Sequence, residues 1–469
     1  MKTAAIIGGG VIGGGWAARF LLNGWNVRIF DPDPQAERKL GEVLTQARWA
    51  LPMLYDRALP EEGQLTFALS LESAVEGADY IQESVPERLD LKHRVYGQIE
   101  AANPGAPLGS STSGFKPSEL REGLATGDRL FVAHPFNPVY LLPLIEVVPG
   151  EGADAGVIGA AKEILTSVGL YPLEIKKEID AHIADRFLEA VWREALWLVR
   201  DGIATTEEID DAIRYGFGLR WAQMGLFETY RIAGGEGGME HFIEQFGPCL
   251  SWPWTKLMDV PELTDELIKT IGDQSDAQSG HHTIRELERL RDTNLIAMMR
   301  ALKARGNAAG ALVAKHEETL PMPDPNTVPM MTIRRVIPVD WTDYNGHMNE
   351  SRYGQVYSDA ADATMVAFGA DADYVADGLS YFTVENLIKY QRETHAGDSV
   401  HVTTRILLAD GKKLKLLHEM RSDGDGEILS TCEQFLLHVS LETRQTCAPR
   451  ADIAQRLAAL ATAHREVPA

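Results

Sequence analysis

Residues 8–13 read Gly-Gly-Gly-Val-Ile-Gly, and this glycine-rich stretch decides the fold of the first third of the chain. A short apolar run, residues 3–7, precedes it, and an apolar-periodic segment, residues 12–23, follows it. A second strand-like run at residues 26–30 completes a strand–helix–strand unit. Such a unit predicts a parallel sheet, so the N-terminal domain is expected to be an α/β domain.

The spacing of these glycines, GxGxxG, indicates what the turn binds. Gly8 allows a tight turn, Gly10 lets the backbone approach a pyrophosphate, and Gly13 lets the helix pack closely on the sheet. The helix begins near Val11 and Ile12, where free backbone N–H groups and the positive end of the helix dipole favour phosphate.

Asp31 ends the second strand, eighteen positions after Gly13. A carboxylate at this place binds the ribose hydroxyls and repels the additional phosphate of NADP. The sequence therefore predicts a Rossmann-type domain with NAD as its cofactor.

Charge and cysteine content restrict the partners and the compartment. The formal net charge is −23, a field that repels nucleic acid and anionic membrane. The three cysteines, Cys249, Cys432 and Cys447, are far apart and form neither a disulfide framework nor a CxxC metal site. No apolar run reaches the roughly 18 residues that a membrane span needs. We expect a cytoplasmic protein that binds no metal, nucleic acid or membrane.

Changes of pattern along the chain predict three domains. Residues 1–180 form the NAD-binding domain, and residues 181–317, dominated by helical periodicity, form an all-α domain for substrate binding and dimerisation. Residues 318–332 hold four prolines and form a linker. Residues 333–445 combine strand-like runs with one long helix and form an α+β domain, followed by a tail at 446–469.

Several elements are specified by residue range. Helices are expected at residues 183–199, 284–303 and 353–368, with another in the tail. Further strands are expected at residues 80–84, 107–110, 130–133 and 145–148, and in the last domain at 333–339, 381–390, 399–408, 412–421 and 428–439.

His134 and Glu146 are the first candidate catalytic residues. His134 opens His-Pro-Phe-Asn-Pro after a predicted strand, and Glu146 lies on the next strand. Oxidation of an alcohol by NAD needs a base for the hydroxyl proton, which histidine provides near neutral pH. A neighbouring carboxylate would orient the imidazole and stabilise its protonated form.

Over residues 3–300 these motifs, with Pro-Glu-Arg-Leu-Asp-Leu-Lys (86–92) and Ser-Thr-Ser (111–113), resemble the 3-hydroxyacyl-CoA dehydrogenase family. The resemblance implies that His134 is the base, Glu146 its partner and Ser113 a donor to the substrate oxygen. It places four residues around the nicotinamide: Glu87, Lys92, Ser113 and Asn137.

The chain departs from this family at Asp185, where the family has asparagine before an arginine. Residues 181–197 resemble the branch of the family that oxidises L-carnitine, a 3-hydroxy acid with a trimethylammonium group. A carboxylate and aromatic faces hold such a group, which makes Asp185 and Trp192 candidate substrate residues. The structural alternatives are a helix N-cap or an ion pair with Arg186 for Asp185, and plain core for the aromatics.

The last domain opens with Asp-Trp-Thr-Asp-Tyr-Asn-Gly-His-Met-Asn (340–349), which resembles hotdog-fold acyl thioesterases over residues 333–440. Asp343 would activate water or attack the thioester, and Asn345 or His347 would help backbone N–H groups to stabilise the oxyanion. Glu393 is a further candidate for positioning water. The alternative is a turn held by local side-chain bonds.

The combined resemblance implies a bifunctional enzyme, a carnitine-oxidising dehydrogenase joined to a thioesterase for an acyl-CoA such as betainyl-CoA. In both families the working unit is at least a dimer, so a homodimer is expected. Two alternatives remain open at this stage. One is a 3-hydroxyacyl-CoA dehydrogenase with a linked thioesterase, and the other is a dehydrogenase with a non-catalytic hotdog module for dimerisation or acyl-CoA binding.

Overall fold

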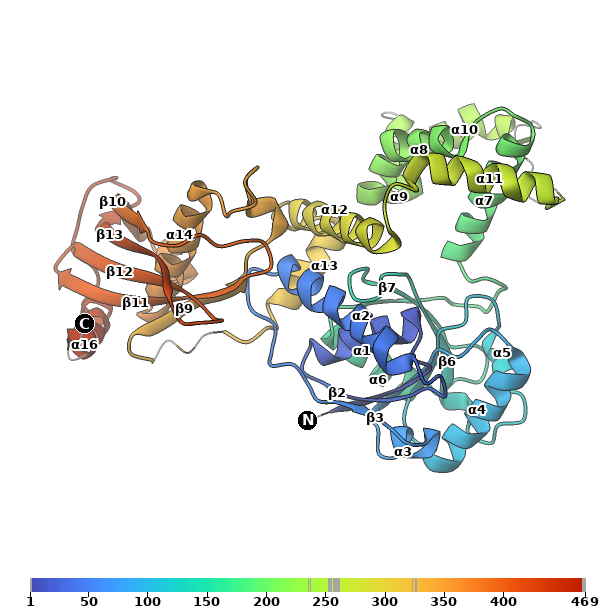
Figure 1. Ribbon diagram of the computed structural model, residues 1–469. Helices are drawn as coiled ribbons and strands as arrows, with labels where there is room; N and C mark the ends of the chain where they lie inside the picture. The colour runs from blue at the N-terminus through green and yellow to red at the C-terminus, as the bar shows by residue number, and fades with distance from the viewer. Residues whose placement is uncertain are drawn as a thin grey trace. The chain divides into compact units, whose positions relative to one another are not determined.

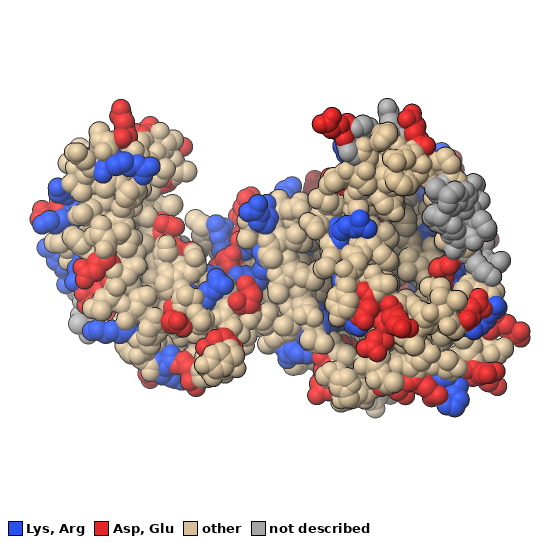
Figure 2. All heavy atoms as spheres, turned by 90° about the horizontal axis from the view of Figure 1, so that it is seen from above, with Lys and Arg blue, Asp and Glu red and all other residues tan. Residues whose placement is uncertain are grey.

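A computed structural model of the chain describes residues 2–234, 236, 238–251, 255, 262–322, 324 and 327–465. The chain forms two compact units, one of Met1–Arg48 with Glu61–His316 and one of Trp49–Pro60 with Glu317–Ala469. Within the described residues, no helix combines the length and apolar character needed to cross a membrane. On the face shown in Figure 2, acidic and basic side chains are interspersed.

An eight-stranded sheet organises the first unit, in the order β3-β2-β1-β4-β5-β6-β7-β8 (Figure 1). Neighbouring strands are parallel except β6 and β7, which pair antiparallel. The strand order reverses between β1 and β4, and ligands of such sheets bind beyond the carboxyl ends of the strands at this point. The strands are β1 (Thr3–Ile7), β2 (Asn26–Phe30), β3 (Leu65–Phe67), β4 (Tyr80–Glu83), β5 (Leu108–Ser110), β6 (Leu130–Pro135), β7 (Leu144–Val148) and β8 (Tyr171–Glu174).

Six helices accompany this sheet. The first, α1, is almost entirely buried because it carries apolar and small residues on all sides, Trp16 and Phe20 among them. The helices are α1 (Val11–Leu21), α2 (Ala36–Ala50), α3 (Leu71–Val75), α4 (Leu89–Ala102), α5 (Pro117–Leu120) and α6 (Ala155–Ser167).

Every regular element that the structure describes in the rest of the first unit is a helix. On α12, the buried carboxylate of Asp292 accepts hydrogen bonds from the Tyr140 hydroxyl at 2.7 Å and the Gln46 amide at 2.8 Å, which ties this helix to the sheet-containing part. The helices are α7 (Ala184–Arg200), α8 (Thr206–Ala212), α9 (Gly218–Ala233), α10 (Gly238–Phe246), α11 (Asp265–Ser279), α12 (Ile284–Ala304) and α13 (Ala308–Glu317).

The second unit is a five-stranded antiparallel sheet, in the order β10-β13-β12-β11-β9, with the long helix α14 against it (Figure 1). Tyr357 of α14 is fully buried and its ring stacks on His418 of the sheet. This is the predicted α+β hotdog arrangement. The elements are β9 (Met330–Val336), α14 (Glu350–Ala367), α15 (Ala372–Ala376), β10 (Leu379–Tyr390), β11 (Ser399–Asp410), β12 (Lys413–Ser422), β13 (Ile428–Ser440) and α16 (Ala451–Arg465).

A segment from the N-terminal third, Trp49–Pro60, belongs to this second unit, and we call it the strap. Its apolar residues Met53, Leu54 and Tyr55 are buried, and the Ala58 N–H donates to the carbonyl of Arg334 at 2.8 Å. The sequence pattern did not predict that this segment would complete the C-terminal unit.

Four strands differ from the sequence expectation. The short edge strands β3 and β8 were not predicted, and neither was the reversed direction of β7 in an otherwise parallel sheet. In the second unit, β9 begins at Met330 rather than at 333, inside the stretch expected to be a linker.

Candidate active sites

The glycine turn between β1 and α1 leaves no space for a side chain at Gly8 or Gly13. Gly8 has φ +102°, and a Cβ atom there would lie 2.5 Å from the Ser84 carbonyl oxygen. A Cβ atom on Gly13 would lie 1.8 Å from the Gly8 carbonyl oxygen, whereas Gly10 faces open space at the helix N-terminus. A dinucleotide that approaches the backbone and the first N–H groups of α1 fits this turn.

Asp31 lies directly beside the turn. Its Oδ2 accepts a hydrogen bond from the Gly9 N–H at 2.5 Å, and its Oδ1 accepts one from the Asp33 N–H at 2.7 Å. These bonds fix the carboxylate at the end of β2, next to the glycines, where the ribose of a bound dinucleotide would be recognised.

A buried ion pair lies at the end of β4. Lys92 is 1% exposed and its Nζ lies 2.8 Å from Glu83 Oε1 and 3.3 Å from Glu87 Oε2. Glu87 Oε1 in turn accepts from the Thr112 hydroxyl and, at 3.3 Å, from the Gly114 N–H. The predicted residues Glu87 and Lys92 therefore lie together, but the main partner of Lys92 is Glu83, which the sequence did not single out.

His134 and Glu146 face each other across the antiparallel pair β6 and β7. They are register partners, and His134 Nδ1 lies 3.0 Å from Glu146 Oε2. Glu146 is fully buried, and its Oε1 accepts from the N–H groups of Ile183 at 3.0 Å and Ala184 at 2.9 Å. Burial alone would raise the pKa of Glu146, but the hydrogen bonds from His134 and the start of α7 hold that pKa below its usual value. The ionised carboxylate of Glu146 therefore orients the imidazole of His134.

The other ring nitrogen of this imidazole faces Asp185. His134 Nε2 lies 3.6 Å from Asp185 Oδ2 in the first turn of α7. Burial raises the pKa of the Asp185 carboxyl. The N-cap of α7 is Ile183 and Arg186 bonds to the Asp180 carbonyl at 3.5 Å, so neither structural alternative for Asp185 describes its place.

His182 was missed by the sequence reasoning. It is fully buried, its ring lies 5.5 Å from that of His134, and its Nε2 lies 3.2 Å from the Thr112 carbonyl oxygen. Ala181 and His182 both adopt positive φ, a conformation rare outside glycine that is concentrated at functional sites. The spacing His-x-x-Asp at the start of a helix was the available signal.

Three other predicted residues are exposed. Ser113 and Asn137 are exposed on the loops that follow β5 and β6. Trp192 is 60% exposed and lies two turns beyond Asp185 on α7, roughly 10 Å along the helix axis. The structure thus assembles His134, Glu146 and Asp185, and it does not bring Trp192 to them.

In the second unit, the Asp343 loop forms a tight turn before α14. Asp343 Oδ1 accepts from the Asn345 N–H at 2.8 Å, and the Asp343 N–H donates to the His347 carbonyl at 2.9 Å. One carboxylate oxygen thus holds the turn, as the structural alternative required. Asn345 is exposed, and the side chain of the helix N-cap, Asn349, accepts from the Ser351 N–H at 3.0 Å.

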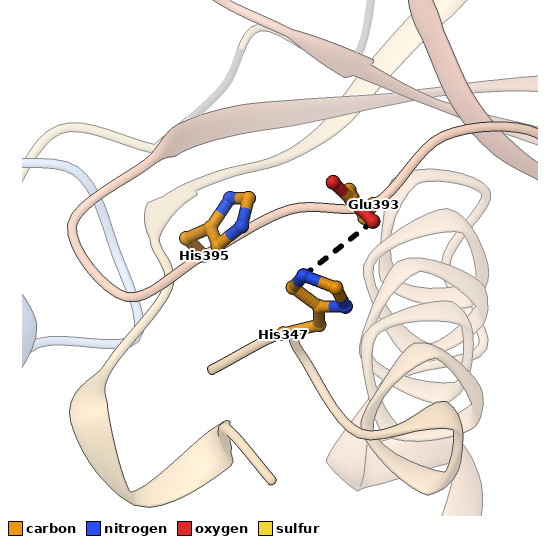
Figure 3. A group of neighbouring side chains, drawn as sticks. All are labelled: His347, Glu393 and His395. Carbon is orange, nitrogen blue, oxygen red and sulfur yellow. Dashed lines mark ion pairs between the residues drawn. The ribbon is translucent and has the colours of Figure 1, made fainter. Parts of the chain in front are cut away.

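His347 and Glu393, predicted from separate stretches, are neighbours. His347 Nε2 lies 3.4 Å from Glu393 Oε2. The dashed line in Figure 3 marks this ion pair. The ring of His395, which was not predicted, lies edge-on to that of His347 with centroids 4.9 Å apart. The Asp343 loop and the stretch after β10 therefore meet at one place.

Family models match three stretches of the chain. Residues 3–179 match the NAD-binding domain of 3-hydroxyacyl-CoA dehydrogenase and residues 182–265 match its C-terminal domain. Residues 337–457 match the thioesterase-like superfamily. The matches confirm the predicted fold classes, their order and NAD as the cofactor.

Three similar proteins match either the whole chain or about two thirds of it. A protein of Ruegeria pomeroyi named L-carnitine dehydrogenase/betainyl-CoA thioesterase is 64% identical, covering 99% of this chain and 96% of that protein. An L-carnitine dehydrogenase of Mesorhizobium japonicum is 60% identical over 66% of this chain and 87% of its own length. The crystal structure of 5-formyl-3-hydroxy-2-methylpyridine 4-carboxylic acid 5-dehydrogenase, an NAD⁺-dependent dismutase, superposes with a TM-score of 0.56 at 28% identity, covering 65% of this chain and 99% of that one. The chain belongs to the family of L-carnitine dehydrogenase/betainyl-CoA thioesterases.

Proposed function

We propose that this chain catalyses two reactions, the NAD-dependent oxidation of L-carnitine to 3-dehydrocarnitine in the first unit and the hydrolysis of betainyl-CoA in the second. The observation that carries the proposal is the placement of His134 between the carboxylates of Glu146 and Asp185, in a chain 64% identical to the Ruegeria pomeroyi protein.

In the first reaction, His134 Nε2 accepts the proton of the substrate hydroxyl, and Glu146 stabilises the imidazolium that results. NAD would be held by the glycine turn and Asp31, and it would supply the acceptor for the hydride of the hydroxyl-bearing carbon. Ser113 donates to the substrate oxygen, while Glu87, Lys92 and Asn137 surround the nicotinamide end. The proton must reach Nε2 rather than Nδ1 because Nδ1 is held by Glu146 at 3.0 Å.

Asp185 is the residue that we assign to the substrate's trimethylammonium group. In L-carnitine one methylene separates the ammonium nitrogen from the hydroxyl-bearing carbon, so the positive charge must lie close to the base. Asp185 Oδ2 lies 3.6 Å from His134 Nε2, so an ammonium group bound beside Asp185 would be close to the base. A bound cation would stabilise the ionised form of a carboxyl whose pKa burial raises.

The KM for L-carnitine in a variant without the Asp185 charge tests this role. Asp185→Asn should raise KM for L-carnitine on the order of tenfold, since tenfold is 1.4 kcal/mol, a modest value for a partly buried charge pair. The matched control is Glu189→Gln, one turn along α7 in an exposed pair with Arg193, which should leave KM unchanged. An unchanged KM in Asp185→Asn would remove Asp185 from the ammonium site.

In the second reaction, Asp343 activates the water that attacks the thioester carbonyl. The carbon–sulfur bond then breaks, coenzyme A leaves as the thiol and glycine betaine is released. Asn345 and His347, with backbone N–H groups at the start of α14, stabilise the oxyanion, and Glu393 positions the water. Support comes from the meeting of the Asp343 loop with His347 and Glu393.

Crossed variants of the full chain test the division of labour. The full chain is used because the strap from the N-terminal third belongs to the C-terminal unit. His134→Ala should abolish carnitine oxidation and leave betainyl-CoA hydrolysis intact, and Asp343→Asn should do the reverse. If Asp343→Asn hydrolysed betainyl-CoA at the unaltered rate, the Asp343 mechanism would be wrong and the unit's role would have to be reassigned.

We also propose a cytoplasmic homodimer. Strand β10 forms one edge of the second sheet and exposes Val384 and Leu387, and α7 exposes Phe187 and Trp192. Exposed apolar side chains on an edge strand mark a surface that another chain covers. The free thiols of Cys432 and Cys447 suit a reducing compartment. Light scattering of the purified chain should give twice the mass of one chain, and Leu387→Lys should lower it.

A further inference from the structure

Three side chains with metal-binding atoms converge in the second unit. His347, Glu393 and His395 each offer one such atom, and these atoms lie within 4.8 Å of one another (Figure 3). All three side chains are at least a third exposed, so an ion can reach them from solvent. Among the described residues, this is the one such group of three or more.

Backbone contacts hold the two segments that carry these residues. His347 and His395 form an antiparallel bridge, and the Met348 N–H donates to the Thr394 carbonyl at 2.8 Å. Glu393 and His395 flank Thr394, so the same bridge and hydrogen bond keep both residues beside His347. The cluster is therefore set by the backbone and does not depend on a chance approach of long side chains.

The donor set has a definite chemical preference. Two imidazoles with one carboxylate suit divalent first-row transition ions such as Zn²⁺, Co²⁺ or Ni²⁺ better than Mg²⁺ or Ca²⁺, which prefer oxygen ligands. With bonds of about 2.0–2.2 Å, a tetrahedral ion holds its ligand atoms roughly 3.4 Å apart. His347 Nε2 and Glu393 Oε2 are already 3.4 Å apart, and His395 needs a small side-chain rotation.

A fourth residue supports one imidazole of the cluster. Asp398 Oδ2 lies 3.6 Å from His395 Nδ1 and accepts from the His395 N–H at 2.8 Å. Histidines that bind metals commonly present one nitrogen to the ion and the other to a carboxylate. In this arrangement His395 would bind through Nε2, with Asp398 orienting the ring.

We propose that His347, Glu393 and His395 bind one divalent transition-metal ion. The ion binds the side chains of His347 and Glu393, and the proposed thioesterase mechanism needs both of them. Because the bound ion withdraws these side chains from the reaction, its binding suppresses thioester hydrolysis. This second part rests on the proposed function, whereas binding of the ion does not.

The binding half is tested on the full chain after removal of any histidine tag. Co²⁺ is titrated while its visible absorption is followed, and Zn²⁺ is titrated in competition with a chromogenic chelator. One equivalent should bind, and His395→Ala should weaken binding on the order of tenfold or more. The matched control is His282→Ala, an exposed histidine 4.0 Å from Glu286, which should change nothing. Equal affinity in His395→Ala and the unaltered chain would overturn the site.

The regulatory half uses enzyme activity. Zn²⁺ should suppress betainyl-CoA hydrolysis in the unaltered chain but not carnitine oxidation. His395→Ala should keep its basal hydrolysis and lose the sensitivity to Zn²⁺. Binding of Zn²⁺ without suppression would overturn this half. A chain that binds Co²⁺ but never hydrolyses betainyl-CoA would instead contradict the proposed function and leave the metal site standing.

Discussion

At the scale of single residues, Glu146 accepts hydrogen bonds from His134 and from two backbone N–H groups at the start of α7. Glu146→Gln keeps the size of the side chain but removes the charge that stabilises the imidazolium. We expect kcat for NAD reduction to fall roughly 10²-fold or more while KM changes little. The control is Glu174→Gln, in an exposed pair with Lys162. A kcat within threefold of the unaltered enzyme would exclude Glu146 as the partner of the base.

The sequence specified His134 and Glu146 because their chemistry follows from residue type and from the strands that carry them. It did not specify Glu83, and for His182 it offered only the His-x-x-Asp spacing. His182 comes close to His134 through a backbone with positive φ, which no residue pattern announces outside glycine. Glu83 forms a buried ion pair with Lys92. The motif at residues 86–92 pointed instead to Glu87, the more exposed partner of Lys92.

At the scale of elements, the strap is held by a buried cation. Arg335 of β9 is 1% exposed, pairs with Asp56 of the strap and, at 3.1 Å, with Asp359 of α14, and lies 4.2 Å from the centroid of the Trp341 ring. Its removal takes this cation away from Asp56 and Asp359. Because these carboxylates are 41% and 34% exposed, the cost stays below the about 3–5 kcal/mol of a fully buried pair.

Hydrogen exchange measures this effect locally. In Arg335→Ala, backbone amides of β9 and of the strap should exchange markedly faster than in the unaltered chain. The neighbouring Arg334→Ala is the control, because Arg334 is half-exposed in its pair with Asp423 and should cost less than about 1 kcal/mol. Equal exchange rates in the two variants would show that Arg335 does not secure the strap.

The elements that the sequence predicted best are the buried ones. Both β1 and β2 occur at the expected residues, because β1 is a buried and largely apolar run and β2 buries its alternate apolar residues, Val27 and Ile29. The strands that were not predicted, β3 and β8, form the two edges of the sheet and are half-exposed, and β8 contains Pro172, which an edge strand tolerates. Sheet edges carry too little apolar pattern to be recognised.

At the scale of the whole molecule, each unit contains a histidine that burial keeps neutral. Burial lowers the pKa of His316 in the first unit and of His418 in the second to about 4 in each case. Between about pH 6.5 and pH 4 the unfolded chain takes up protons at these positions that the folded chain does not. The free energy of unfolding should therefore fall as pH falls through this window, by up to about 3 kcal/mol for each histidine.

Thermal unfolding at several pH values measures this dependence. The unaltered chain should lose stability steadily from pH 7 to pH 5, and His418→Gln should show a flatter dependence for the second unit, because glutamine does not titrate. A stability that is constant or rises on acidification would contradict the assignment of neutral, buried histidines.

The order of domain types followed from the sequence because each has its own periodicity and motif. The membership of the strap in the C-terminal unit did not, since contacts between residues nearly 300 positions apart, such as Asp56 with Arg335, leave no local pattern. Neither the periodicity nor the fold predicts the substrate of the first unit. L-carnitine and a 3-hydroxyacyl-CoA would both use His134 as the base.

The most direct test of the central claim is the absorbance of reduced nicotinamide when the full chain is given NAD with L-carnitine, 3-hydroxybutyrate or 3-hydroxybutyryl-CoA in parallel. We predict rapid reduction with L-carnitine and little with either comparator, because only L-carnitine carries the cation that faces Asp185. Reduction with 3-hydroxybutyryl-CoA alone would contradict the account and identify the first unit as a 3-hydroxyacyl-CoA dehydrogenase.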